Sequence, residues 1–104
     1  MSSSFPEKPI LEVETLLVDD ERSVARVVIN GLNSRIVNHR STTTYSVCYG
    51  GGYMEIDGVM HVLEDGVELT VPAGTPYRDA GHQLVMIATS VPPFNRADVE
   101  ILAE

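Results

Sequence analysis

The sequence contains little cysteine and few aromatic residues. Its 104 residues include one cysteine, no tryptophan and 6% aromatic residues. The single cysteine, Cys48, excludes an internal disulfide and a zinc site built from cysteines alone. It stands between Val47 and Tyr49, with no histidine or cation close in sequence to lower its pKa. We therefore expect Cys48 to be a buried and unreactive thiol.

Long apolar runs are also missing, so no segment is long enough to span a bilayer. The first nine residues, MSSSFPEKP, lack the basic start and the apolar stretch of a secretion signal. We therefore expect a cytoplasmic protein with no membrane partner.

Basic residues are scarce. Seven Lys and Arg against 15 Asp and Glu give a formal net charge of −8. This charge argues against a nucleic acid partner, because affinity for phosphates depends largely on Lys and Arg. The 43% hydrophobic and 21% charged residues are typical of a globular protein. We expect residues 1–9 to be a flexible tail and residues 10–104 to form one domain.

Short strand patterns separated by turn residues run through most of the chain. Aliphatic, β-branched and aromatic residues predict strands over the segments Ile10–Val18, Val24–Ile29, Arg35–His39, Thr42–Tyr49, Tyr53–Ile56, Val59–Leu63, Val67–Val71 and Leu84–Thr89. Such a series of about eight or nine strands predicts an all-β sandwich or barrel. No helical pattern of 10–15 residues separates the strands, which argues against a parallel sheet.

The turn residues predict how neighbouring strands connect. Asp57-Gly58 is a strong signal for a two-residue hairpin, because both turn positions favour positive φ. Gly50–Gly52 predicts a bend or a bulge, and Asp19–Glu21 is more typical of a solvated turn than of a metal cluster. Only Asn95–Leu102 has a weak helical pattern, and it is short.

The segment from Gly66 to Tyr77 resembles the second conserved motif of the cupin family. In that motif a glycine is followed after five residues by Pro-x-Gly, and a metal-binding histidine comes after two more residues. Gly66, Pro72 and Gly74 match this spacing, and Tyr77 stands in the histidine position. The resemblance covers residues 36–94 and implies a double-stranded β-helix, the jelly-roll barrel of cupins.

The first cupin motif is poorly matched. It contains His-x-His, then a glutamate and then a glycine. With Gly52 as the glycine, Tyr45 takes the glutamate position, and His39 and Ser41 take the two histidine positions. Shifting the anchor by two residues also finds no glutamate. The resemblance therefore implies the barrel without its usual metal site, and we expect no metal and no other cofactor.

We expect the residues at the former ligand positions, with one nearby arginine, to line a pocket for a small polar molecule, namely Arg35, His39, Ser41, Tyr45 and Tyr77. The arginine shares a strand face with His39 and can pair with a carboxylate or a phosphate. The alternative is that the two tyrosines fill the space left by the metal and form part of the core. The sequence leaves both interpretations open.

Four further positions are more typical of surface residues than of a functional site. His61 and His82 leave a different metal site open, but their surroundings are more typical of surface histidines. We expect Arg78 and Asp79 to form surface ion pairs of little energetic value.

Two functional hypotheses follow. The first is a metal-independent cupin that binds a small polar molecule, as a sensor or an accessory subunit. The alternative, implied by the resemblance, is an isomerase, epimerase or cyclase acting on a sugar-like or keto-acid substrate. In this enzyme His39 is the general base, and Tyr77 or Tyr45 is the acid.

Small cupins commonly pair through an edge strand. The aliphatic segments Ile10–Val18 and Val24–Ile29 suit such pairing, so we expect a homodimer.

Overall fold

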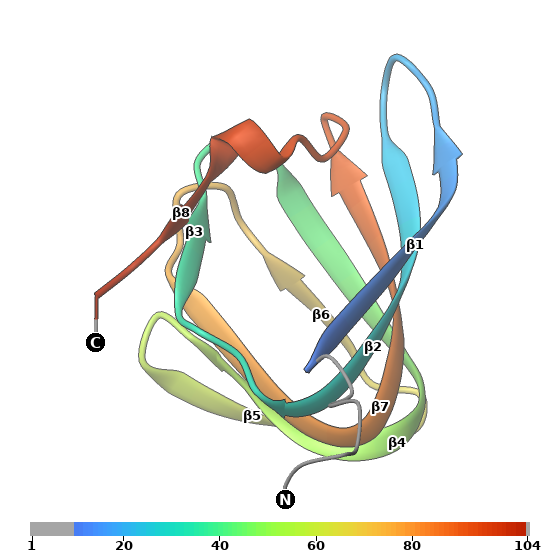
Figure 1. The fold of residues 1–104 in the computed structure, drawn as a ribbon, viewed down its shortest axis with the longest axis vertical. Coiled ribbons are helices and arrows are strands. Elements are labelled where there is room, and N and C mark those ends of the chain that lie inside the picture. The colour runs from blue at the N-terminus through green and yellow to red at the C-terminus, as the bar shows by residue number, and fades with distance from the viewer. Residues whose placement is uncertain (1–9, 104) are drawn as a thin grey trace, which may run out of the picture.

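The computed structural model describes residues 10–103 and is almost entirely β-structure (Figure 1). The strands are β1 (Leu11–Val18), β2 (Ser23–Leu32), β3 (Ile36–Asn38), β4 (Thr42–Ile56), β5 (Val59–Leu63), β6 (Glu68–Val71), β7 (Tyr77–Val91) and β8 (Val99–Ile101). A single 3₁₀ turn, η1 (Arg96–Asp98), precedes β8 among these residues. No helix in the described part of the chain is long and apolar enough to cross a membrane.

All strand pairs are antiparallel and belong to one curled sheet. Its main path runs β1-β2-β7-β3-β8, while β4 pairs with β5, β6 and β7. The two longest strands, β4 and β7, pair from Thr42 opposite Val91 to Ile56 opposite Tyr77. Figure 1 shows the sheet rolled into an open barrel. The predicted all-β jelly-roll architecture is thereby confirmed.

The glycine run lies inside β4 and does not end it, so the two strands predicted on either side of it are one. A side chain at Gly52 would place its Cβ 2.0 Å from the carbonyl oxygen of Ala80. At Gly50, where φ is +93°, the Cβ would lie 2.1 Å from the oxygen of Gln83. Register shifts fall on the same stretch, between Val47 and Gly51. These glycines therefore let β4 bend closely against β7 and curl the sheet.

The prediction that Cys48 is buried is wrong, since this residue is exposed. Thr43, Tyr45 and Val47 face inward in regular alternation, which puts Cys48 on the outer face of β4. The alternation breaks after Cys48, where the register shifts between Val47 and Tyr49. Val47 is buried, whereas Cys48 and Tyr49 both face solvent.

The core lies between the walls of the curled sheet. Its fully buried apolar side chains come from β2, β4, β5 and β7, and they are Ile29, Met54, Leu63, Leu84 and Met86. The predicted hairpin between β4 and β5 is confirmed, with φ of 50° at Asp57 and 81° at Gly58. The predicted turn at Asp19–Glu21 is also confirmed and is exposed.

The weak helix predicted over Asn95–Leu102 is wrong. Only the short turn η1 forms, and β8 follows it at once and pairs with β3. Strand pairing satisfies the backbone groups of this segment, which is too short to stabilise a helix by itself.

Of the two strands expected to mediate dimer formation, β2 lies inside the sheet and has no free edge. It is hydrogen-bonded to β1 on one side and to β7 on the other. In the described chain β1 pairs with β2 alone, and every one of its residues is exposed. The homodimer stays a prediction, and β1 is the strand whose edge remains for it.

Candidate functional site

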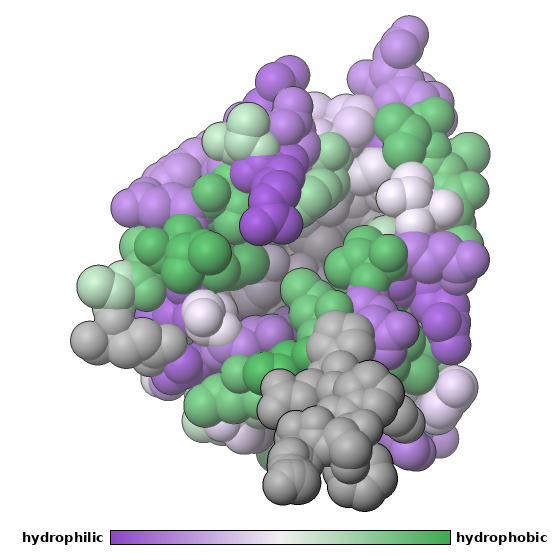
Figure 2. Space-filling view, viewed as in Figure 1, coloured by the Kyte–Doolittle hydropathy of each residue, from purple (hydrophilic) through white to green (hydrophobic). Residues whose placement is uncertain are grey.

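A cavity of about 480 Å³ lies inside the open barrel. This volume is within the range of small-molecule sites, roughly 300–1,000 Å³. Figure 2 shows a hollow at this face of the molecule, bordered by both hydrophobic and hydrophilic surface. One side of the cavity is apolar, with contributions from β1, β2 and β3 that include Leu11, Val13, Val27 and Ile36.

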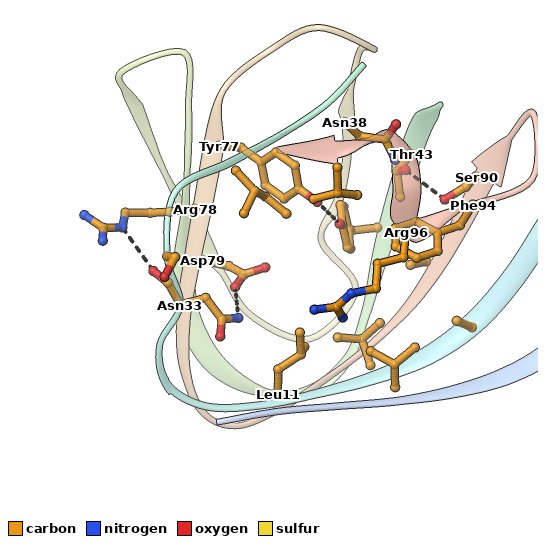
Figure 3. Close-up of a pocket in the computed structure, with 18 of the residues that line it drawn as sticks. Leu11, Asn33, Asn38, Thr43, Tyr77, Arg78, Asp79, Ser90, Phe94 and Arg96 are labelled. Carbon is orange, nitrogen blue, oxygen red and sulfur yellow. Dashed lines mark hydrogen bonds between the residues drawn. The ribbon is translucent and has the colours of Figure 1, made fainter. Parts of the chain in front are cut away.

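Two tyrosine hydroxyls meet in the polar part of the cavity (Figure 3). The Tyr45 and Tyr77 oxygens lie 2.7 Å apart, and the ring centroids are 6.0 Å apart. Burial raises the pKa of Tyr77 to about 12 and raises the pKa of Tyr45 well above its usual value. Both phenols are therefore neutral at physiological pH and act as hydrogen-bond donors or acceptors.

A buried carboxyl group lies next to this pair in the sequence of β7. Asp79 is two residues beyond Tyr77, and a strand places such residues on the same face. Its Oδ1 accepts a hydrogen bond of 2.5 Å from Nδ2 of Asn33. Burial raises the pKa of the Asp79 carboxyl, and the hydrogen bond from Asn33 opposes part of this rise. Asp79 is thus a carboxyl group suited to holding or releasing a proton.

A second hydroxyl pair lies between the same two strands. Thr43 on β4 and Ser90 on β7 share a hydrogen bond of 2.8 Å, and both residues are buried. Thr43 is two residues before Tyr45, so the period of two again brings a hydroxyl to the cavity face. The polar wall therefore offers four hydroxyl groups and one carboxyl group.

The segment that leads into η1 supplies two further lining residues. Phe94 is half exposed and its backbone N–H donates to Oγ of Ser23, at 2.9 Å. Arg96, the first residue of η1, extends its side chain into the cavity in Figure 3.

Comparison with known proteins gives structural neighbours but no sequence family. No protein-family model matches the chain, and no curated protein matches it. A Streptomyces PAC13 variant, solved with uridine, superposes with a TM-score of 0.83 and 25% identity over 93% of this chain and 82% of the other. PAC13 is a nucleoside dehydratase.

Two more distant neighbours share the fold. A double-stranded β-helix protein from Klebsiella pneumoniae has a TM-score of 0.79 and 13% identity, covering 96% of this chain and 90% of its own. The cupin domain of Schizosaccharomyces pombe Cnp3 has a TM-score of 0.74 and 11% identity, covering 85% and 69%. This chain therefore has the double-stranded β-helix fold of cupins.

The structure places only some of the five residues predicted to bind a ligand at the cavity. Tyr45 and Tyr77 line the cavity, and they bond to each other and not to the backbone. Arg35, His39 and Ser41 do not line it. The two tyrosines are therefore both part of the core and part of a pocket wall.

The three other residues have partners elsewhere. Arg35 pairs with Glu55 at 2.5 Å, and the exposed His39 pairs with Glu100 at 2.8 Å. The Ser41 hydroxyl donates to the carbonyl oxygen of Pro92. The prediction assumed an unbroken alternation from residue 35 to residue 41, but β3 ends at Asn38 and the chain bends after it.

The residues that line the cavity do not fit a metal ion. The two motif positions that face each other carry neutral phenols, which are poor ligands. Within residues 10–103, no group of three or more His, Cys, Asp or Glu side chains is placed to hold a metal. His61 and His82 do not line the cavity either. These residues therefore do not form a metal-binding site.

Sequence reasoning missed Asp79, which was expected to pair with Arg78 on the surface. That prediction is wrong, because Asp79 is 7% exposed and bonded to Asn33. The signal was present, since Asp79 follows Tyr77 at the spacing of one strand face. Asn33 lies 46 residues away in the chain, and no local pattern links it to Asp79.

The tyrosine pair gives a direct test of the cavity wall. We expect Tyr77→Phe to destabilise the protein by about 1–2 kcal/mol, because the buried Tyr45 hydroxyl loses its partner. The double variant with Tyr45→Phe should cost less than the sum of the two single changes. Urea denaturation of the four proteins measures the coupling, with the exposed Tyr49→Phe as a control. Strictly additive losses would show that the two hydroxyls do not support each other.

Proposed function

We propose that this cupin binds a nucleoside-sized polar molecule inside its barrel and converts it by proton transfer, without a metal. The observation that carries the proposal is the cavity wall itself. The neutral hydroxyls of Tyr45 and Tyr77 and the buried carboxyl of Asp79 face one space of about 480 Å³. Tyr45 and Tyr77 stand at two of the motif positions where the resemblance to cupins places metal ligands.

The cavity has a polar side and an apolar side, which suits a ligand with a polar part and an apolar part. Hydroxyl pairs at Tyr45–Tyr77 and Thr43–Ser90 suit the hydroxyl groups of a sugar. The apolar side, with Val27 and Ile36, suits a flat ring. PAC13, at 25% identity, is a structural neighbour that was solved with uridine and acts on a nucleoside, and this supports the same ligand class here.

The proposed chemistry is general acid–base catalysis. Asp79 removes or returns a proton at a ligand carbon or oxygen, since burial raises the pKa of its carboxyl and makes it a stronger base than an exposed aspartate. The Tyr77 hydroxyl donates a hydrogen bond to the oxygen on which negative charge develops. Dehydration, isomerisation and epimerisation all need these two roles. The proposal therefore assigns the base to Asp79 in place of His39, which lies outside the cavity lining.

A titration with uridine tests the proposal. We expect uridine to bind the wild-type protein in calorimetry and to perturb the amide resonances of β4 and β7. Ala88→Phe places a ring in the cavity, because Ala88 lines it between β2 and β4, and should weaken binding by at least about 10-fold. Ala73→Phe, on an exposed turn outside the lining, is the matched control and should bind as the wild type does. Equal binding by the Ala88 variant, with its fold intact by circular dichroism, would place the site elsewhere.

A further inference from the structure

Arg96 is a cation held over the cavity without a partner. Among the described residues its guanidinium makes no hydrogen bond and no ion pair, although the protein has 15 acidic residues against seven basic ones. Asp98, on the same turn, forms no ion pair with it. Figure 3 shows the side chain reaching into the space between the polar wall and β1. A guanidinium in this position is available to a ligand.

The backbone that presents Arg96 is well fixed. The Asn95 side chain accepts a hydrogen bond of 2.9 Å from the N–H of Ala97, and the N–H of Asp98 donates to the Asn95 carbonyl at 2.9 Å. The N–H of Val99 donates to the carbonyl of Arg96 itself, and β8 then pairs with β3. Since the turn is anchored on both sides, the position of Arg96 over the cavity is built into the fold.

No other charged residue of the lining neutralises the charge of Arg96. Arg78 donates from Nε to the Asn33 carbonyl at 3.3 Å, and in Figure 3 its guanidinium lies away from the cavity. Asp79 is the one acidic residue of the lining, and it is engaged with Asn33. A chain with a net charge of −8 therefore has a cavity that favours negative charge.

We propose that the ligand of this cupin carries an acidic group, a carboxylate or a phosphate monoester, and that Arg96 binds this group at the cavity mouth. The inference rests on the function proposed above, because the remainder of the ligand occupies the same cavity. A guanidinium pairs with either group through two parallel N–H···O hydrogen bonds. Arg96 then determines which nucleoside-like molecules are accepted, whereas Asp79 and the tyrosines act on the uncharged part.

The test compares uridine, uridine 5′-monophosphate and uridine 5′-carboxylate by calorimetry at low salt. We expect the wild type to bind at least one of the two acids about 10-fold or more tightly than uridine. Arg96→Gln should reduce this preference to less than about 2-fold. The exposed Arg40→Gln, outside the lining, is the matched control and should keep the preference. The acid that loses most affinity in Arg96→Gln identifies the acidic group.

Two outcomes would overturn the inference, and they separate it from the proposed function. If uridine binds but neither acid binds more tightly, or if the preference survives in Arg96→Gln, the acidic ligand is wrong and the cavity assignment stands. If none of the three compounds binds the wild type, both the acidic ligand and the nucleoside-sized ligand are wrong.

Discussion

Replacing Asp79 with asparagine is expected to stabilise the protein at neutral pH and to abolish its chemistry. Asparagine has nearly the same shape and retains an oxygen that accepts the hydrogen bond from Asn33. It removes a carboxyl that is costly to ionise in a buried position. We expect a gain of about 1 kcal/mol in the free energy of unfolding at pH 7. Turnover of a substrate should fall by about 10²–10⁴-fold, the usual contribution of a general base.

The pH dependence of stability follows from the direction of the Asp79 pKa. Because its pKa is raised in the folded protein, the folded state holds the proton when the unfolded state has already lost it. Asp79 therefore lowers the stability of the wild type as the pH rises from the ordinary aspartate pKa through the raised one. Below both values its contribution vanishes. The asparagine variant should lack this decline.

Urea denaturation between pH 4 and pH 8 measures the difference between Asp79→Asn and the wild type. Asp65→Asn, in an exposed turn, is the matched control and should follow the wild-type curve. The difference between the two curves isolates Asp79 from the other carboxylates. A variant that is less stable than the wild type at pH 7, or a difference independent of pH, would show that Asp79 is not the costly group described here.

The second large effect concerns the bend in β4. We expect Gly52→Ala to destabilise the protein by about 3 kcal/mol or more, because the new Cβ would meet the backbone oxygen of Ala80 at 2.0 Å. Backbone atoms on a paired strand cannot move aside as a flexible side chain can. For a domain of about 100 residues this corresponds to a fall in Tm of roughly 12–24 °C.

The adjacent glycine supplies the control for this experiment. Gly51→Ala introduces the same methyl group where nothing lies within 4 Å, so its effect should stay within about 0.5 kcal/mol. Thermal unfolding monitored by circular dichroism distinguishes the two variants. Equal Tm values for Gly51→Ala and Gly52→Ala would contradict the close approach of β4 and β7 on which the barrel depends.

The architecture was predictable because its signals are local. Alternating residues predicted most strands, and Asp57-Gly58 predicted the hairpin with its two positive φ angles. The spacing of Gly66, Pro72 and Gly74, which resembles a cupin motif, then favoured the jelly roll over other all-β folds. Tyr45 and Tyr77, which stand at motif positions, both line one cavity, and their binding of a ligand stays a prediction.

The rest of the site was not predictable because it depends on irregular backbone and on distant contacts. The end of β3 at Asn38 turned His39 towards Glu100. Asp79 is buried and accepts a hydrogen bond from Asn33, which is 46 residues away in the chain. Arg96 reaches the cavity because an expected helix became a turn and a strand.

Calorimetric titration of chelator-treated protein with uridine and its two 5′ acids tests the central claim most directly. The claim is that hydroxyl groups and one carboxyl have replaced the metal ligands as the means by which this barrel holds its ligand. The account predicts that treatment with EDTA leaves the affinity unchanged and that added divalent metal does not strengthen it. Affinity that disappears on chelation and returns with metal, or no binding by either form of the protein, would contradict the account.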